Sequence, residues 1–183
     1  VHWVVGSSEK MNLVNIIFNN EKIDLNSHLK NIGDDYRYVN KKTRANLKVQ
    51  DGCSFYCSYC IVPFARGAPK SKNYKEVLDE ANKFISSGFK EIVLTGINIG
   101  LYECNNKNLD DLIYNMCLLD GLKRLRISSI EPKSVSNLIL NKMSEPKSLL
   151  CRYLHIPLQS GSNKILFDMG RKYTAEEFKY IVD

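Results

Sequence analysis

No apolar run in this sequence approaches the roughly 20 residues that a helix needs to cross a lipid bilayer. The first residues, VHWVVGSSEK, also lack the basic segment followed by an apolar core that is typical of a signal peptide. We therefore expect a protein with no membrane partner. A cluster of thiols that must stay reduced, described next, adds to this and favours the cytoplasm.

Cysteine is absent from residues 1–46, and all six cysteines follow that stretch. Cys53, Cys57 and Cys60 lie close together in the spacing C-x3-C-x2-C, just after the turn signal Asp51-Gly52. A fourth ligand, which structural zinc sites usually have, is not visible nearby. Three thiolates on one short loop suit a 4Fe–4S cluster with one iron left free for another ligand. A zinc knuckle, a redox pair and a chance cluster are the alternatives.

The formal net charge is +6 over 183 residues, and 44% of the residues are hydrophobic. This charge permits a nucleic-acid partner without establishing one. The length provides one good core and part of a second domain.

From residue 47 onward, strand and helix patterns alternate. We expect strands over residues 47–50, 91–95, 124–130 and 153–158. We expect helices that begin near Asn73, Asn108, Ser134, Ser162 (or Ser160) and Thr174. Four successive strand–helix units predict a parallel α/β sheet, which could be an open doubly wound sheet or a barrel.

The pattern C-x3-C-x-aromatic-C, with Tyr59 before the last cysteine, resembles the signature of the radical S-adenosylmethionine (SAM) superfamily. The longer run GCSFYCSYCIVPFARG resembles its methylthiotransferase branch, which attaches a methylthio group to tRNA or to a ribosomal protein. Residues 154–162, LHIPLQSGS, extend the resemblance, as do Met169, Arg171, Tyr173 and Thr174. It implies a catalytic 4Fe–4S cluster on Cys53, Cys57 and Cys60, with SAM at the open iron. It also implies tRNA, at an anticodon-loop adenosine, and an electron donor such as flavodoxin or ferredoxin as partners.

The same resemblance implies a fold and a domain division. The fold would be a partial parallel (β/α) barrel of the radical SAM type, with about four of six units present. Residues 1–46 would be the tail of an N-terminal methylthiotransferase domain and a linker, and residues 47–183 a C-terminally truncated core domain. Because residues 1–46 hold no cysteine for the family's second cluster, we expect that this chain alone does not complete methylthiolation.

Polar and glycine-bearing turns follow the expected strands, and the resemblance assigns cofactor contacts to them. The candidates are Tyr59, Thr95, Gly96, Ser129, Glu131 and Gln159. Glycine allows the backbone to approach the methionine amino group of SAM closely. Glu131 could equally cap the helix that follows it. His155, inside an expected strand, is more often a structural residue.

Three further observations bear on the substrate and the remaining polar groups. The turn LTGINIG resembles the subgroup that acts on threonylcarbamoyladenosine in tRNA; the alternatives are isopentenyladenosine in tRNA, a ribosomal protein, and a non-catalytic, zinc-stabilised RNA-binding module. Where the family usually has Ser-Arg after its Arg-Gly pair, this chain has Ser71-Lys72, so the bidentate fork of arginine is lost. Cys104, Cys117 and Cys151 are not assigned to the cluster, and the last two are expected to be small buried residues.

Overall fold

The computed structural model describes residues 43–183. The expectations for residues 1–46 fall almost entirely outside this range. The regular elements, in chain order, are β1 (Arg44–Lys48), β2 (Gln50–Asp51), α3 (Val62–Arg66), β3 (Lys70–Ser71), α4 (Tyr74–Ser86), β4 (Glu91–Thr95), the 3-10 turn η3 (Ile99–Leu101), β5 (Glu103–Cys104), β6 (Lys107–Asn108), α5 (Leu109–Met116), β7 (Arg124–Ile127), the 3-10 turn η4 (Pro132–Ser134), α6 (Asn137–Ser144), α7 (Asn163–Asp168) and α8 (Ala175–Val182).

The main sheet has three parallel strands in the order β1-β4-β7. Its central strand carries three consecutive buried residues, Ile92, Val93 and Leu94, because both faces of β4 are covered. The parallel α/β sheet expected from the sequence is therefore confirmed. The first strand begins at Arg44, three residues before the expected start, because Ala45 and Leu47 alternate into the core while their neighbours stay exposed.

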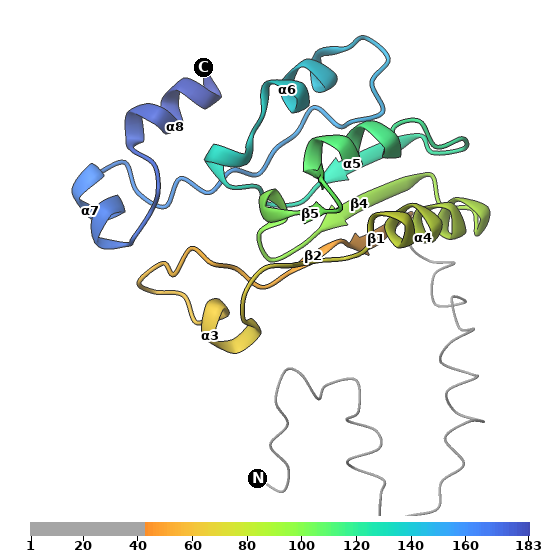
Figure 1. Ribbon diagram of the computed structural model, residues 1–183. Helices are drawn as coiled ribbons and strands as arrows, with labels where there is room; N and C mark the ends of the chain where they lie inside the picture. The colour runs from red at the N-terminus through yellow and green to blue at the C-terminus, as the bar shows by residue number, and fades with distance from the viewer. Residues whose placement is uncertain (1–42) are drawn as a thin grey trace, which may run out of the picture. The chain divides into compact units, whose positions relative to one another are not determined.

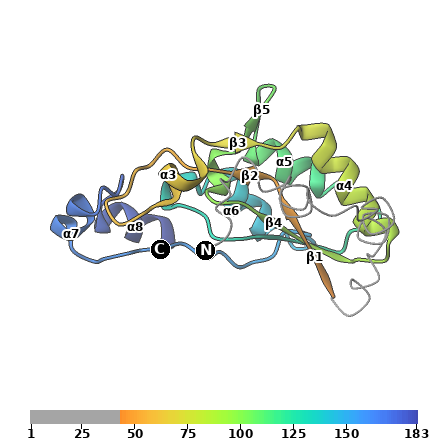
Figure 2. The same cartoon turned by 90° about the horizontal axis from the view of Figure 1, so that it is seen from below.

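Helices α4 and α5 lie on one face of the sheet, as Figure 2 shows. The Asn73 side chain accepts hydrogen bonds from the backbone N–H groups of Lys75 and Glu76, so α4 begins where the sequence placed its cap. Asn108 and Asp111 form a capping box at the start of α5. The apolar face expected for α5 is confirmed, since all four of its members are buried: Leu109, Leu112, Ile113 and Met116. Of the helices in residues 43–183, none is long and apolar enough to cross a membrane.

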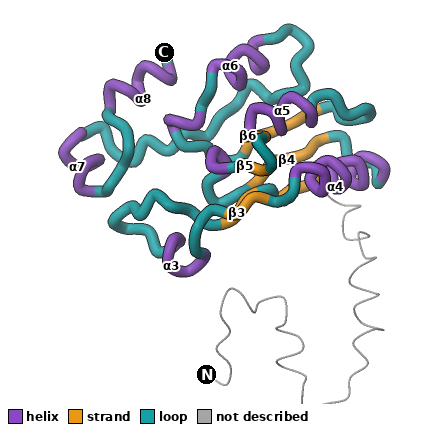
Figure 3. Tube along the Cα trace, viewed as in Figure 1, coloured by secondary structure: helices purple, strands orange, loops and turns teal. Residues whose placement is uncertain are grey.

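The prediction of a fourth regular strand over residues 153–158 is wrong. This segment is drawn as a loop in Figure 3 and meets the sheet through isolated parallel bridges, Leu125 with Leu150 and Ser129 with His155. Pro157 has no N–H to donate to a ladder, and a Tyr153-to-Cys151 backbone hydrogen bond turns the chain before the bridge at His155. The chain nevertheless runs parallel to β7 at this edge, so the order of the units is kept.

The structure moves the start of α6 and decides between the two expected starts of α7. Helix α6 begins at Asn137 and not near Ser134, because Pro132–Ser134 forms a 3-10 turn and Ser136 caps the helix proper. Helix α7 follows Ser162, and a Thr174–Glu177 capping box starts α8 as expected. The loops and short helices that follow the strands, including α3 and α7, gather at the end of the sheet toward which β1 and β4 point (Figure 1). In parallel α/β folds this end of the sheet is where functional sites are built.

Candidate functional site

The three clustered cysteines lie on the loop between β2 and α3. None of them forms a disulfide, and each is partly exposed. The loop is closed at its base by a hydrogen bond from the Cys53 N–H to the Gly67 carbonyl oxygen (3.1 Å). A tight turn brings Cys60 back, since its N–H donates to the Cys57 carbonyl oxygen (2.9 Å). Three free thiols are thus presented by one short, internally bonded segment.

Hydrogen-bond donors point at two of the three sulfurs. The Asn98 side-chain amide and the Phe55 N–H donate to Cys53 Sγ at 3.6 and 3.5 Å. The Arg171 guanidinium donates to Cys57 Sγ through Nη1 at 3.4 Å. Hydrogen bonds to the sulfur ligands are one of the features that tune an iron–sulfur centre. The donor set therefore fits a metal centre held by cysteine sulfur.

A single metal ion and a cubane cluster place different demands on these residues. No group of three or more His, Cys, Asp or Glu side chains within residues 43–183 is arranged to hold one ion. A single ion needs its donors to converge on one point. In a 4Fe–4S cluster each cysteine binds a different iron atom, so the three sulfurs need not converge. Three-thiolate ligation of a cluster by this loop stays a prediction.

The turn after β4 is fastened to the cysteine loop by Gln50, a residue that the sequence analysis did not single out. Gln50 is only 2% exposed, and its Oε1 accepts hydrogen bonds from the N–H groups of Ile97 (3.1 Å) and Asn98 (2.8 Å). Its Nε2 donates to the carbonyl oxygens of Asp51 (2.9 Å) and Gly52 (2.7 Å). One amide therefore fixes the turn that begins at Gly96 against the residue that precedes Cys53. The only sequence signal for it was a polar residue at the end of a strand.

Replacing Gln50 by leucine is expected to lower the free energy of unfolding by about 2–4 kcal/mol. The change keeps the volume but leaves two N–H groups and two carbonyl oxygens without their partner in a buried position. Chemical denaturation followed by circular dichroism measures the loss. Gln159→Leu is the matched control at an exposed position, where about 0.5 kcal/mol or less is expected. Equal effects at both positions would contradict the assignment.

Glu131 and Arg171 form an ion pair beside the cysteine loop. The Arg171 side chain is 3% exposed, and its Nη1 also donates to the Tyr59 hydroxyl oxygen (3.3 Å). Burial raises the pKa of the Glu131 carboxyl, while the guanidinium acts to lower it. Burial likewise raises the pKa of the Tyr59 hydroxyl. The Glu131 side chain makes no capping hydrogen bond to the η4 turn that follows it. Its carboxylate pairs with Arg171 instead.

The other candidate residues lie along the same end of the sheet. Thr95 ends β4, and its carbonyl oxygen accepts the Val49 N–H (2.9 Å). Ser129 Oγ and His155 Nδ1 are hydrogen-bonded at 2.7 Å. Gln159 is exposed, with a positive backbone φ of 65°. The structure joins Tyr59 and Glu131 through Arg171. As cofactor contacts, all six candidates stay predictions: Tyr59, Thr95, Gly96, Ser129, Glu131 and Gln159.

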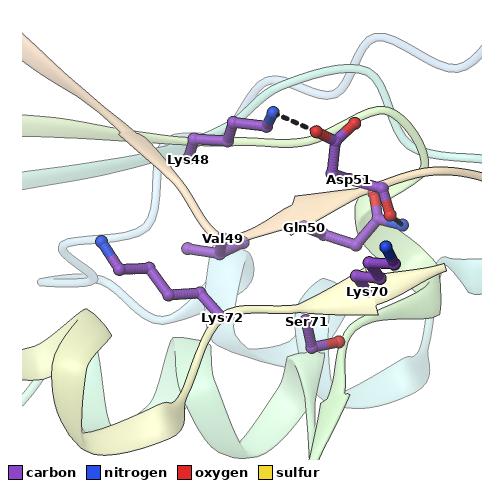
Figure 4. A pocket seen from close by; sticks show the side chains of 7 residues that line it. All are labelled: Lys48, Val49, Gln50, Asp51, Lys70, Ser71 and Lys72. Carbon is purple, nitrogen blue, oxygen red and sulfur yellow. Dashed lines mark hydrogen bonds and ion pairs between the residues drawn. The ribbon is translucent and has the colours of Figure 1, made fainter. Parts of the chain in front are cut away.

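A depression over the β2–β3 hairpin is lined in part by Lys72, where the resemblance led us to expect an arginine (Figure 4). Its lining residues are Lys48, Val49, Gln50, Asp51, Lys70, Ser71 and Lys72. The Lys48 ammonium pairs with Asp51 (2.6 Å), and the Lys72 ammonium pairs with Glu80 of α4. Lys72 therefore ties the hairpin to a helix, which gives its charge a structural partner.

Two of the remaining cysteines sit away from the cluster loop. Cys117 caps the end of α5, and Cys151 follows the bridge at Leu150. Burial raises the pKa of both thiols, which disfavours the reactive thiolate. Both residues are partly buried, where full burial was expected.

Comparison with known proteins shows the family. The model of the radical SAM superfamily matches residues 47–183. The chain is 41% identical over 140 residues to the threonylcarbamoyladenosine tRNA methylthiotransferase MtaB of Bacillus subtilis, which covers 75% of this chain and 31% of that protein. It is 42% identical over 146 residues to the tRNA-2-methylthio-N(6)-dimethylallyladenosine synthase of Lawsonia intracellularis, covering 75% and 32%. The chain thus spans about a third of the length of these relatives.

Comparison with solved structures also indicates a radical SAM fold. The radical SAM methyltransferase TsrM of Kitasatospora setae, solved with tryptophan substrate and a SAM analogue, superposes with a TM-score of 0.64 at 18% identity. The match covers 81% of this chain and 29% of that one. Together with the family match, it confirms the expected fold class and the resemblance that began at the cysteine motif. The chain belongs to the radical SAM superfamily.

Proposed function

We propose that this chain carries the catalytic core of a tRNA methylthiotransferase, in which Cys53, Cys57 and Cys60 hold a 4Fe–4S cluster that binds SAM. The observation that carries the proposal is the cysteine loop: three free thiols on one segment, with side-chain donors aimed at Cys53 and Cys57. The loop lies in a chain that is 41–42% identical to proteins named as tRNA methylthiotransferases.

The residues of the chain have distinct tasks in this proposal. When bound, the cluster supplies the electron that cleaves the sulfonium of SAM. Asn98 and Arg171 stabilise charge on the cysteine sulfurs through their hydrogen bonds. The backbone of the turn from Thr95 to Asn98, whose Ile97 and Asn98 N–H groups are held by Gln50, offers carbonyl groups for the amino group of SAM. Tyr59, which lies on the loop and is 53% exposed, offers an aromatic face to the adenine.

For the substrate we favour threonylcarbamoyladenosine in tRNA, because the sequence of the turn after β4, LTGINIG, resembles the subgroup that acts on this nucleoside. Relatives named for threonylcarbamoyladenosine and for dimethylallyladenosine are almost equally similar, at 41% and 42% identity. The second nucleoside is therefore the competing candidate. A tRNA partner at an anticodon-loop adenosine, an electron donor such as flavodoxin or ferredoxin, and a cytoplasmic location belong to the same proposal.

Anaerobic reconstitution with iron and sulfide tests the proposal. We expect about four iron and four sulfide per chain, because each cubane contains four of each. With a strong reductant, the reconstituted chain should convert SAM to 5′-deoxyadenosine. Stoichiometric zinc without sulfide would overturn the proposal in favour of a structural metal module. Adding tRNA that carries either modified nucleoside discriminates the substrates: the cognate tRNA should stimulate 5′-deoxyadenosine formation more than the other.

A further inference from the structure

A distant segment of the chain is docked onto the cysteine loop. The Ser58 N–H donates to the Met169 carbonyl oxygen (3.0 Å), although these residues are far apart in sequence. Gly170, with a φ of 69°, lies against the backbone of Tyr56 and Cys57. The positive φ turns the chain at the end of α7. The next side chain, Arg171, therefore enters the site.

The Arg171 guanidinium is the buried centre of this contact. Its side chain is 3% exposed, and its Nη1 donates to Cys57 Sγ (3.4 Å) and to the Tyr59 hydroxyl oxygen (3.3 Å). Its Nη2 pairs with Glu131, and the guanidinium carbon lies 5.1 Å from the centre of the Tyr173 ring. An arginine side chain stays protonated in proteins, and here it has the Glu131 carboxylate as its partner. The group is thus a permanent cation next to a candidate iron ligand.

Glu131 fixes the orientation of this cation and opposes its charge. The carboxylate comes from the segment after β7, whose backbone is held by the Ile130 N–H donating to the His155 carbonyl oxygen (3.0 Å). The Glu131 side chain is 18% exposed, so water screens the pair only in part. Cation and anion therefore act on the cysteine loop with opposite sign.

We propose that Arg171 is a positioning residue that raises the reduction potential of the cluster through its hydrogen bond and charge at Cys57, and that Glu131 counterbalances it. The inference rests on the proposed function in one respect, the cluster on the three cysteines. Reduction adds one negative charge to a cluster, so a neighbouring cation or hydrogen-bond donor favours the reduced state. A neighbouring anion disfavours it.

A redox titration of the reconstituted full chain, followed by electron paramagnetic resonance, tests this. Arg171→Met is expected to shift the midpoint potential to a more negative value, because it removes the donor and the charge. Arg171→Lys, which keeps the charge, should shift it less. Glu131→Gln, which keeps the size and removes the negative charge, should shift it to a more positive value. Arg152→Met is the control, since that guanidinium bonds to backbone carbonyl groups at the end of α6.

The opposite signs separate an electrostatic role from a purely structural one. Loss of packing alone would lower iron content in both variants and would not move the potential in opposite directions. Shifts of equal sign, or no shift in variants that keep the wild-type iron content, would overturn the inference while leaving the proposed function standing. If the Arg171→Met variant takes up no cluster, the Arg171→Lys and Glu131→Gln variants still show the direction in which the midpoint potential shifts. A wild-type chain that takes up no iron and sulfide would overturn both.

Discussion

Cys57→Ala is expected to reduce 5′-deoxyadenosine formation to the background of a reaction without enzyme. The substitution removes one of the three proposed cluster ligands and the sulfur that Arg171 contacts. With only Cys53 and Cys60 left, the proposed cluster would lack one of its thiolate ligands, and cluster binding depends on cysteine ligation. Iron and sulfide analysis after anaerobic reconstitution should show a loss of the 4Fe–4S complement in parallel with the loss of cleavage.

Cys104→Ala is the matched control for this prediction. Cys104 is also a partly exposed free thiol, but it lies in β5, away from the cysteine loop in sequence. The variant should keep the wild-type iron and sulfide content and the wild-type rate of SAM cleavage. Cofactor cleavage that survives in Cys57→Ala at the wild-type rate would rule out the assigned ligand set.

Gly52→Ala is expected to lower the free energy of unfolding by about 3 kcal/mol or more and to prevent cluster uptake. Gly52 has a φ of 73°, a conformation that side-chain-bearing residues rarely adopt. A Cβ at this position would also meet the Ala68 carbonyl oxygen at 2.2 Å and the Gly67 carbonyl oxygen at 2.6 Å. Because Gly67 accepts the Cys53 N–H, relieving this clash requires the base of the cysteine loop to open.

Gly88→Ala separates the backbone strain from the clash. Gly88 also has a positive φ, of 97°, but a Cβ there would meet nothing within 4 Å. We expect a loss of about 1–2 kcal/mol and normal iron uptake, because only the conformational cost applies. Thermal denaturation compares the two variants, and iron content shows which of them damages the site. Similar losses at both glycines would contradict the close approach at Gly52.

Local signals in the sequence were sufficient for much of the fold. Asn73, Asn108 and Thr174 all cap helices as expected, because each cap bonds to backbone groups within three residues. The regular strand expected over residues 153–158 is not formed, although the apolar pattern of this segment resembles that of a strand. Its pairing depends on hydrogen bonds to β7, and a pattern of side chains does not contain that information.

At the site, sequence patterns indicate the residues within motifs but not the residues that connect one motif to another. Gln50 was read as part of a strand, yet its amide joins the cysteine loop to a turn 47 and 48 positions away. The resemblance includes Arg171 but implies no role for it, and the sequence is compatible with Glu131 as a cofactor contact or as a helix cap. Their ion pair was invisible because 40 positions separate them.

The sequence alone therefore determined the spacing of three thiols, the alternation of strands and helices, and the family. These properties are local, since they depend on neighbours within a loop or a helical turn. The tertiary structure decided which groups touch the sulfurs: Asn98 at Cys53 and Arg171 at Cys57, which are 45 and 114 positions apart. Such contacts arise because parallel strands deliver their loops to one end of the sheet, whatever their distance along the chain.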